Sequence, residues 1–490
     1  MKKSTFAVAV LVALGAVCTG GAWYTGTKAE SEFGRVVEQS NQILKKQLLN
    51  LDINAEIKNV KFERGLFSST TKYDVVFTNK EKEAMVLPFE GHLYHGPLPL
   101  NQLSKGNFKP LVFSSEDQMV KNEQSEPLFK LANGKKPFVS QLQLDYTKTA
   151  EIKYDVPLLE MVGQQDFDKL SIKGSRGETV LAKNGDARGS LHIDTIEMVG
   201  KLSAAEGENN DGVSIISFNG IDIASDLKHT EWDLLDQGTL TIDVDSVKAT
   251  EQGKDETLEA KGLSFDYKLD KKDEFVDLAM NIKFKELANK DKVVPFDNQW
   301  QLGFNHLDGA ALNELFHRLI ARSQQGEDAE TELTEREEAL LKTIQQKAPN
   351  FVVGQVLKND KGENNALLDF TLSNSDLAAD LDQGKLLSLF SGLKFDANLD
   401  KESLLKFHSD LVELSNSEDK EEVLASGKAN LESMIDAGVS SEILVKTEKG
   451  AKLNLILENG VLKLNDKEIP EEQVAMILFL AIMGMGSGMQ

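Results

Sequence analysis

Residues 276–285, Val-Asp-Leu-Ala-Met-Asn-Ile-Lys-Phe-Lys, place an apolar side chain at every second position. Successive side chains of a β-strand point to opposite faces of a sheet, so this period of two gives one apolar and one polar face. A long strand with one solvent-exposed face is typical of antiparallel sheets. The stretch therefore predicts a long antiparallel strand, and its length favours one large curved or twisted sheet over a compact sandwich.

The same alternation extends on both sides of this stretch, from about Ile53 to Leu307. Clear runs are Leu142, Leu144 and Tyr146; Leu240, Ile242 and Val244; and Leu263, Phe265, Tyr267 and Leu269. Turn signals such as Asn219-Gly220 and Asn184-Gly185-Asp186 separate them. No fixed repeat period connects the runs, which argues against a propeller or solenoid. We predict an antiparallel β domain over residues 52–306.

Beyond residue 307, helical and extended patterns alternate. Apolar residues at helical spacing follow Asp308, and Thr334 with Glu337 forms a capping box before a second helix. Strands are predicted at 368–372 and 393–399, helices near 404–411 and 421–437, and a hairpin at Asn459-Gly460. We therefore predict a mixed region over residues 307–490 that continues the sheet. The predicted fold class is α+β: a large curved antiparallel sheet with a mixed helix/strand C-terminal third packing on it, preceded by an N-terminal membrane anchor helix.

The N-terminus carries an export signal, because Lys2 and Lys3 precede an uncharged stretch from Phe6 to Trp23. About eighteen apolar residues approach the roughly twenty that cross a bilayer as a helix. One interpretation is a retained anchor over residues 1–27, with Trp23 and Tyr24 at the far interface, followed by a helical stalk over residues 28–51. The other interpretation is cleavage after Ala22. Either way, the rest of the chain is exported.

The formal charge of −24, from 79 acidic and 55 basic residues, excludes nucleic acid as a partner. Cys18, inside the apolar stretch, is the only cysteine, so the exported part has no thiol enzyme chemistry and no internal disulfide. His92 and His95 are close in sequence, but an extended segment points them to opposite faces. No nucleophile elbow and no phosphate-binding glycine loop occurs. We predict no catalytic residue, no cofactor and no metal.

The last apolar segment, Val474 to Met483, follows Pro470-Glu471-Glu472, which suits a helix start. Ten uncharged residues are too few to span a bilayer. Either this helix packs on the sheet, or it faces a membrane or a partner.

Five short motifs occur in a fixed order along the chain. They are Gly20-Gly21-Ala22-Trp23-Tyr24-Thr25-Gly26; Arg64-Gly65-Leu66-Phe67-Ser68-Ser69; His95-Gly96-Pro97-Leu98-Pro99; Pro127-Leu128-Phe129 with Gly134 and Pro137-Phe138; and Asn459-Gly460 with Leu464-Asn465. In this order they resemble the YdgA-like family of Gram-negative bacteria, a domain of unknown function. The resemblance implies a protein of the bacterial inner membrane with the bulk of the chain in the periplasm, and self-association. It implies no activity and no catalytic residue.

The motif positions suit turns and strand starts better than catalysis, because most are Gly, Pro or aromatic. We therefore predict structural roles for Arg64, Gly65, Phe67, His95, Gly96, Pro97, Pro127 and Phe129. Arg64 is the charged exception, with a hydrogen bond to strand carbonyls as one reading and anion recognition as the other.

Three classes of function follow from these features. The first is non-enzymatic binding or shuttling of an apolar envelope ligand such as a lipid, since a long one-sided sheet can offer an apolar groove. The alternative is an envelope scaffold or protein-interaction module, in particular a homodimer or other homo-oligomer, that contacts the membrane through its N-terminal segment. An enzyme is the third class, and no sequence motif supports it.

Overall fold

The computed structural model describes residues 41, 53–65, 68–79, 84–162, 168–201, 213–251, 257–290, 292–323, 333–415, 419–458 and 460–470. Of these residues, 57% lie in strands and 22% in helices. The chain divides into two compact units. The first comprises Met1–Glu231, Gly238–Asp255 and His317–Glu330, and the second comprises Trp232–Gln237, Glu256–Phe316 and Thr331–Gln490.

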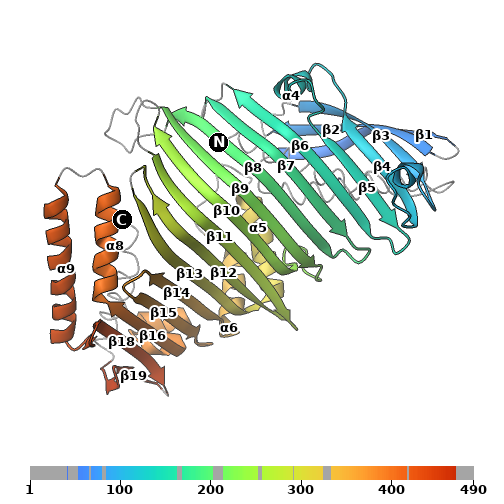
Figure 1. Cartoon of the computed structure of the whole chain (residues 1–490). Coiled ribbons are helices and arrows are strands. Elements are labelled where there is room, and N and C mark those ends of the chain that lie inside the picture. Colours follow the sequence, from blue (N-terminus) through green and yellow to red (C-terminus); the bar gives the residue numbers. More distant parts are fainter. Residues whose placement is uncertain are drawn as a thin grey trace. The chain divides into compact units, whose positions relative to one another are not determined.

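The first unit is a sheet in which each strand pairs antiparallel with the next one along the chain (Figure 1). Two short helices, α3 (Leu100–Leu103) and α4 (Glu126–Leu131), interrupt the series. The strands are β1 (Ile53–Arg64), β2 (Ser68–Asn79), β3 (Ala84–His95), β4 (Leu111–Met119), β5 (Val139–Asp145), β6 (Ala150–Val162), β7 (Lys169–Leu181), β8 (Ala187–Lys201), β9 (Val213–Lys228) and β10 (Gln237–Glu251).

One face of this sheet carries the core of the first unit. The fully buried rings of Phe77, Phe89, Phe113 and Phe138 come from β2, β3, β4 and the segment before β5. Phe89 stacks on Tyr73 with ring centroids 5.4 Å apart, and the ring of Phe138 meets it edge-on at 5.8 Å. At the outer edge, the side-chain amide of Asn41 accepts a hydrogen bond from the Ile57 N–H at 2.7 Å and donates to the Ile57 carbonyl at 3.3 Å.

Halfway along β7, β8 and β9, the apolar side chains change from one set of alternate positions to the other. Ile193 and Ile196 of β8 both pack in the same apolar cluster, although they are three residues apart. Gly174 and Gly220, with φ of 66° and 59°, lie at this change, and the strands keep their register on both sides. A Cβ on Gly174 would lie 1.8 Å from an oxygen of Asp194, so glycine is required for both conformation and space.

The second unit repeats the antiparallel pattern from β11 to β16, and β16 then pairs with β18. Its strands are β11 (Thr257–Lys272), β12 (Phe275–Ala288), β13 (Val293–Asp308), β14 (Asn350–Lys358), β15 (Glu363–Leu372), β16 (Phe390–Asp400), β17 (Val445–Lys446), β18 (Gly450–Glu458), β19 (Val461–Leu464) and β20 (Lys467–Glu468). Its helical segments are α5 (Gly309–Ser323), which ends in residues of the first unit, α6 (Glu335–Gln346), α7 (Leu377–Asp382), η3 (Leu387–Leu389), α8 (Lys401–Leu414) and α9 (Lys420–Ser440).

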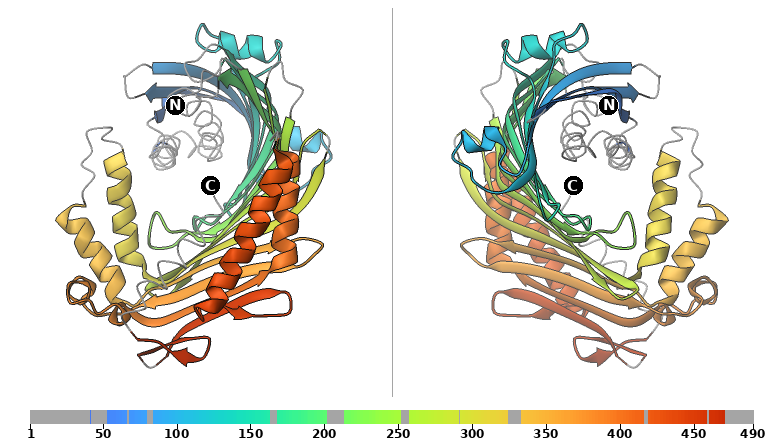
Figure 2. Two further views of the ribbon diagram at one scale, coloured as in Figure 1. Left: turned by 90° about the vertical axis from the view of Figure 1, so that its left-hand side faces the viewer. Right: turned by 90° about the vertical axis from the view of Figure 1, so that its right-hand side faces the viewer.

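Helices cover parts of this second sheet. Leu312 and Leu315 of α5 join Leu340 and Ile344 of α6 in a buried cluster with Leu269 of β11. The helices α8 and α9 lie side by side (Figures 1 and 2). Helix α8 also reaches the sheet, where Phe407 stacks on Phe296 of β13 at 4.5 Å between ring centroids.

Several local predictions are confirmed. Residues 276–285 lie within β12 and pair along β11 and β13. The predicted capping box is present, because Glu337 N–H donates to Thr334 Oγ1 at 3.3 Å and the Thr334 N–H donates to the Glu337 carboxylate at 2.7 Å. The predicted hairpin joins β18 to β19, with Glu458 opposite Val461.

The predicted fold class is wrong. Antiparallel strands dominate the described residues, including the C-terminal third, where β14 to β20 extend the pattern of β11 to β13. The physical reason is that apolar residues such as Phe351, Leu368 and Phe395 continue the same alternate positions across paired strands. Within the described ranges, no helix combines the length and apolar character needed to cross a bilayer. The anchor predicted for residues 1–27, the stalk apart from Asn41, and Val474 to Met483 lie outside those ranges.

A buried polar network fixes the start of α8. The Asp400 carboxylate accepts from the Ser403 N–H at 3.0 Å, and the Asp400 N–H donates to Asn364 Oδ1 at 2.7 Å. Asn364 Nδ2 in turn donates to Ser403 Oγ at 2.9 Å. Helix α8 therefore begins where β15 and β16 meet.

We predict that Asp400→Ala lowers the free energy of unfolding by about 1–2 kcal/mol, because the first turn of α8 loses its N-cap acceptor in a buried position. Asp400→Asn keeps an acceptor oxygen and should lose less than half of that. Urea unfolding followed by circular dichroism measures both. Equal stability of the alanine variant and the wild type would contradict the assigned cap.

Candidate functional site

The strand register of the second unit lines up apolar side chains across β11 to β15. Three such rows, called here the apolar rows, run from strand to strand. They are Leu269, Leu278, Phe304, Phe351 and Phe370; Tyr267, Met280, Leu302, Val353 and Leu368; and Phe265, Ile282, Trp300, Gln355 and Ala366. Because paired residues share a face of the sheet, the rows form one continuous apolar surface.

The three rows differ in how far they are covered. The first row is the most covered, since Leu269 is fully buried beneath α5 and α6. The other two rows are largely half-buried, and Ile282 in the third row is 42% exposed. Contiguous apolar surface of this kind marks binding sites more often than chance exposure of single side chains does.

Aromatic contacts hold the first row in place. Phe351 stacks on Phe370 at 5.1 Å between ring centroids, and Phe304 meets Phe351 edge-on at 5.8 Å. The polar member of the third row, Gln355, donates from Nε2 to Asn298 Oδ1 at 3.3 Å. The rows therefore offer rigid apolar contact with little hydrogen-bonding demand, which suits a hydrocarbon chain.

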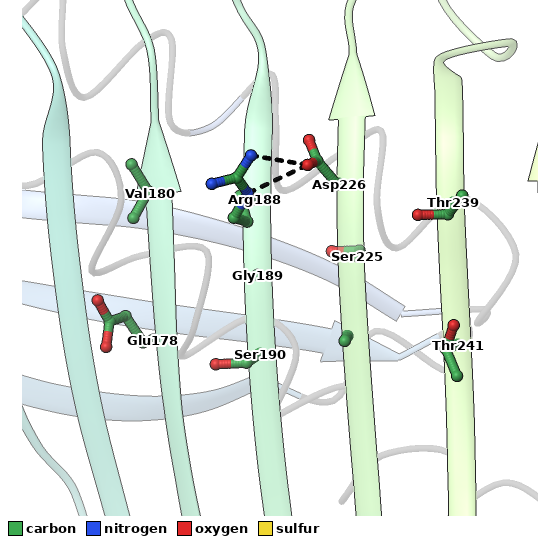
Figure 3. A pocket seen from close by; sticks show the side chains of 10 residues that line it. Glu178, Val180, Arg188, Gly189, Ser190, Ser225, Asp226, Thr239 and Thr241 are labelled. Carbon is green, nitrogen blue, oxygen red and sulfur yellow. Dashed lines mark hydrogen bonds and ion pairs between the residues drawn. The ribbon is translucent and has the colours of Figure 1, made fainter.

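A second candidate site is a pocket of about 340 Å³ on β7 to β10 of the first unit (Figure 3). Small residues, Gly189, Ser190, Ala224 and Ser225, lie between larger side chains. The lining also includes Glu178, Val180, Arg188, Asp226, Thr239 and Thr241. Hydroxyl, carboxylate and guanidinium groups of this kind bind polar molecules through hydrogen bonds.

The charged pair of this pocket is already satisfied. Arg188 donates from Nε and Nη2 to the same oxygen of Asp226, at 3.2 and 2.7 Å. Figure 3 shows the two side chains meeting above neighbouring strands. An exposed pair of this type contributes little to stability.

A charged row lies beside the pocket on the same strands. His192 of β8 contacts Asp222 Oδ1 through Nδ1 at 2.7 Å and Asp194 Oδ1 through Nε2 at 3.0 Å. The hydrogen bond with Asp222 is the main cause that raises the pKa of His192 above its usual value, while burial and the charge of Arg176 oppose it. His192 therefore keeps its proton to a higher pH in the folded chain than an ordinary histidine does.

The structure brings several family-motif positions to one end of β1 to β4. Arg64 ends β1 opposite Ser69, and the Gly65 N–H donates to the Ser68 carbonyl at 2.8 Å in the turn that follows. His95 ends β3 and contacts Ser69 Oγ through Nε2 at 2.9 Å. The backbone of residues 96 and 97 then bonds to β4, through the Gly96 N–H to the Val112 carbonyl and the Leu111 N–H to the Pro97 carbonyl, each at 2.9 Å.

The remaining motif positions lie elsewhere. Pro127 stands in the first turn of α4, and Phe129 of the same helix packs against the apolar cluster of the first unit. Phe67, Trp23 and Tyr24 lie outside the described residues. Those motif positions that the structure describes therefore do not converge on the apolar rows or on the pocket.

Sequence reasoning found the apolar rows in part and missed the pocket. Phe265, Met280 and Ile282 were already assigned to one face by their alternation. Arg188 and Asp226 meet although they are 38 residues apart, so only the pairing of β8 with β9 reveals them.

Nearly the whole chain is similar to known bacterial proteins. Residues 1–472 match the family model described as bacterial protein of unknown function (DUF945). An uncharacterized protein of Haemophilus influenzae is 30% identical over 66% of this chain and 87% of its own length. Protein YdgA of Escherichia coli is 36% identical over 38% of each chain, and uncharacterized protein YihF of the same organism is 23% identical over 95% of this chain and 97% of its own. The resemblance to the YdgA-like family is thus confirmed.

We predict that the pKa of His192, measured by NMR titration of the full chain, lies above the ordinary value of a histidine, about 6.5. Asp222→Asn should move it toward that value, because the largest cause of the shift is removed. A raised folded pKa stabilises the fold fully below the unfolded pKa, and this contribution is lost as pH rises through the folded pKa. The stability difference between wild type and Asp222→Asn should therefore shrink from pH 6 to pH 8.

The matched control for this titration is Asp243→Asn, which removes one carboxylate charge from exposed Asp243 of β10. A pKa of His192 that moves equally in both variants would contradict the assigned hydrogen bond.

Proposed function

This chain belongs to the DUF945 family of bacterial proteins of unknown function, and we propose that it binds an apolar ligand, such as a lipid acyl chain, without enzymatic turnover. The observation that carries the proposal is the half-exposed part of the apolar rows. Ile282 is 42% exposed in the middle of a β-strand, and Met280 and Trp300 beside it are half-buried.

Burial of a hydrocarbon chain on the apolar rows supplies enough free energy for binding. Each buried methylene contributes about 0.8 kcal/mol, so about eight methylenes on the rows contribute roughly 6 kcal/mol before the cost of association. The rows span five paired strands, β11 to β15, which neighbour one another at about 4.8 Å. A chain of that size can therefore lie across the sheet and contact side chains from several strands.

The location that we propose is the inner membrane of the bacterial envelope, with the bulk of the chain in the periplasm. Support comes from Lys2 and Lys3 before the uncharged stretch from Phe6 to Trp23. In that compartment, lipids are an abundant source of hydrocarbon chains, and the binding or shuttling of a lipid fits an exported chain.

The alternative is an envelope scaffold or homodimer. The observation that favours it is the helix pair α8 and α9, on which Leu411 and Met434 are 37% and 54% exposed. Exposed apolar side chains on neighbouring helices suit contact with another protein chain or with a second copy.

The test uses tryptophan fluorescence. The sequence holds three tryptophans, so the double variant Trp23→Phe/Trp232→Phe leaves Trp300 as the only one. We expect a fatty acid carrying a bromine atom to quench Trp300 with a saturable curve. Ile282→Lys should weaken binding at least tenfold, because an ammonium group then stands in the apolar contact, a loss of about 1.4 kcal/mol or more.

The matched control is Asn281→Lys, which places the same charge on the next residue and hence on the opposite face of β12. We expect it to stay within twofold of the wild type. Absence of quenching, or equal loss in both lysine variants, would refute the ligand-binding proposal. Twice the chain mass in light scattering without quenching would support the homodimer.

A further inference from the structure

Two neighbouring loops of the first unit expose large apolar side chains. One loop connects β3 to β4 and contains α3, and the other is the turn between β5 and β6. In the first loop, Leu98 is 43% exposed, Leu100 59% and Phe108 71%, and Tyr146 in the second is 60% exposed. The last three are the highest exposed fractions of large apolar side chains among the residues that the structure describes. These four side chains are called here the loop patch.

Contacts between the strand ends bring the two loops together. The register places Leu111, the first residue of β4, opposite Asp145, the last residue of β5. Lys109 Nζ lies 3.6 Å from Asp145 Oδ2, and Tyr146 is the next residue along the chain. The Leu111 N–H donates to the Pro97 carbonyl at 2.9 Å, which closes the first loop. Both loops therefore project from the same end of neighbouring strands.

Helix α3 buries its polar side chains and exposes an apolar one. Asn101 and Gln102 are buried, whereas Leu100 beside them is exposed. Asn101 Nδ2 and Gln102 Nε2 both donate to Ser114 Oγ, at 3.1 and 2.9 Å. Asn107 Nδ2 donates to Gln102 Oε1 at 3.0 Å, so the amides also hold the second half of the loop. This reverses the usual distribution of polar and apolar residues and fixes the loop with Leu100 on the outside.

The charge around the loop patch differs from that of the chain as a whole. Residues 91–115 contain no Asp and no Glu, although the chain has 79 acidic residues and a formal charge of −24. Lys105 and Lys109 lie in this segment and pair with Glu116 at 2.8 Å and with Asp145 at 3.6 Å. The acidic groups at the patch are therefore balanced by lysines, which suits a surface where hydrocarbon meets anionic head groups.

We propose that the loop patch inserts into the interface of a lipid bilayer, where the head groups meet the acyl chains. Leucine and aromatic side chains are the types that enter this layer, and lysine ammonium groups stay on its polar side. The contact is separate from the N-terminal segment and from the apolar rows. It rests on the proposed location beside a membrane and does not depend on the proposed ligand binding.

The size of the loop patch favours a bilayer over a protein partner. A stable protein interface buries about 800 Å² on each side, from roughly 20–30 residues. The patch, in contrast, consists of four side chains on two loops. Insertion of so few side chains is weak on its own. Because the proposed location already keeps the chain at a bilayer, the effective concentration of lipid is high and weak insertion is sufficient.

The test places a fluorescent label at Phe108. Cys18→Ala removes the only cysteine, so Phe108→Cys provides a unique site for an environment-sensitive fluorophore. The full chain is reconstituted into vesicles of equimolar phosphatidylcholine and phosphatidylglycerol, with lipids that carry a nitroxide quencher on the acyl chain. We expect at least threefold stronger quenching than for the control Lys135→Cys. Lys135 is exposed in the connection from α4 to β5, at the opposite end of β4.

A second variant removes the remaining side chains of the loop patch. Leu98→Ser/Leu100→Ser/Tyr146→Ser, in the chain labelled at residue 108, should reduce quenching at least twofold while the circular dichroism spectrum stays unchanged. The matched control replaces exposed apolar side chains of the second unit and should leave quenching unaltered; it is Leu258→Ser/Val293→Ser/Met434→Ser.

Flotation of the chain with the vesicles tests the proposed location separately. A chain that floats with the vesicles while its label at residue 108 is quenched no more than the label at residue 135 would overturn the insertion of the loop patch alone. An emission shift that grows with the ratio of protein to lipid, without nitroxide quenching, would assign the patch to a second copy of the chain and also overturn the proposal. A chain that does not float would refute both the location and the insertion.

Discussion

Cross-strand register is the constraint on which this protein depends. The side chains of a strand alternate between two faces, so a slip of one residue would exchange its apolar and polar sets. In the second unit the register from β13 to β15 is continuous, with Leu302 opposite Val353 and Val353 opposite Leu368. The apolar rows exist only because every strand keeps this alignment. The same kind of alignment in the first unit places Ser140 of β5 opposite Asp117 of β4.

Local patterns were sufficient to predict individual strands, a helix cap and a hairpin, although the predicted fold class was wrong. The alternation in residues 276–285 determines a strand and its apolar face before any partner is known. Thr334 with Glu337 and Asn459-Gly460 act over three residues or fewer, so their hydrogen bonds and turn preferences are readable in the chain itself. The C-terminal third was harder, because helices α5, α6, α8 and α9 alternate with strands there, and a helix pattern next to a strand pattern does not reveal how many strands share a sheet.

Other features depend on pairs of strands and are invisible in a single stretch. The change of alternate positions in β7 to β9 rests on Gly174 standing against Asp194, which only the pairing reveals. Arg188 and His192 acquire their partners from β9 in the same way. Asp117 is a different case. The sequence itself shows an acidic residue at an alternate position between Phe113 and Met119, where an apolar residue is expected. The sequence does not show which residues of the other strands lie beside it.

The contact between Asn41 and Ile57 has a consequence for the behaviour of many chains together. A side-chain amide offers one donor and one acceptor, the same pair that a neighbouring strand would present to Ile57. By occupying the N–H and C=O groups of Ile57 in strand β1, Asn41 prevents a strand of another polypeptide from forming hydrogen bonds at this residue. This side-chain amide therefore opposes strand-by-strand aggregation at Ile57 through a contact within the same molecule.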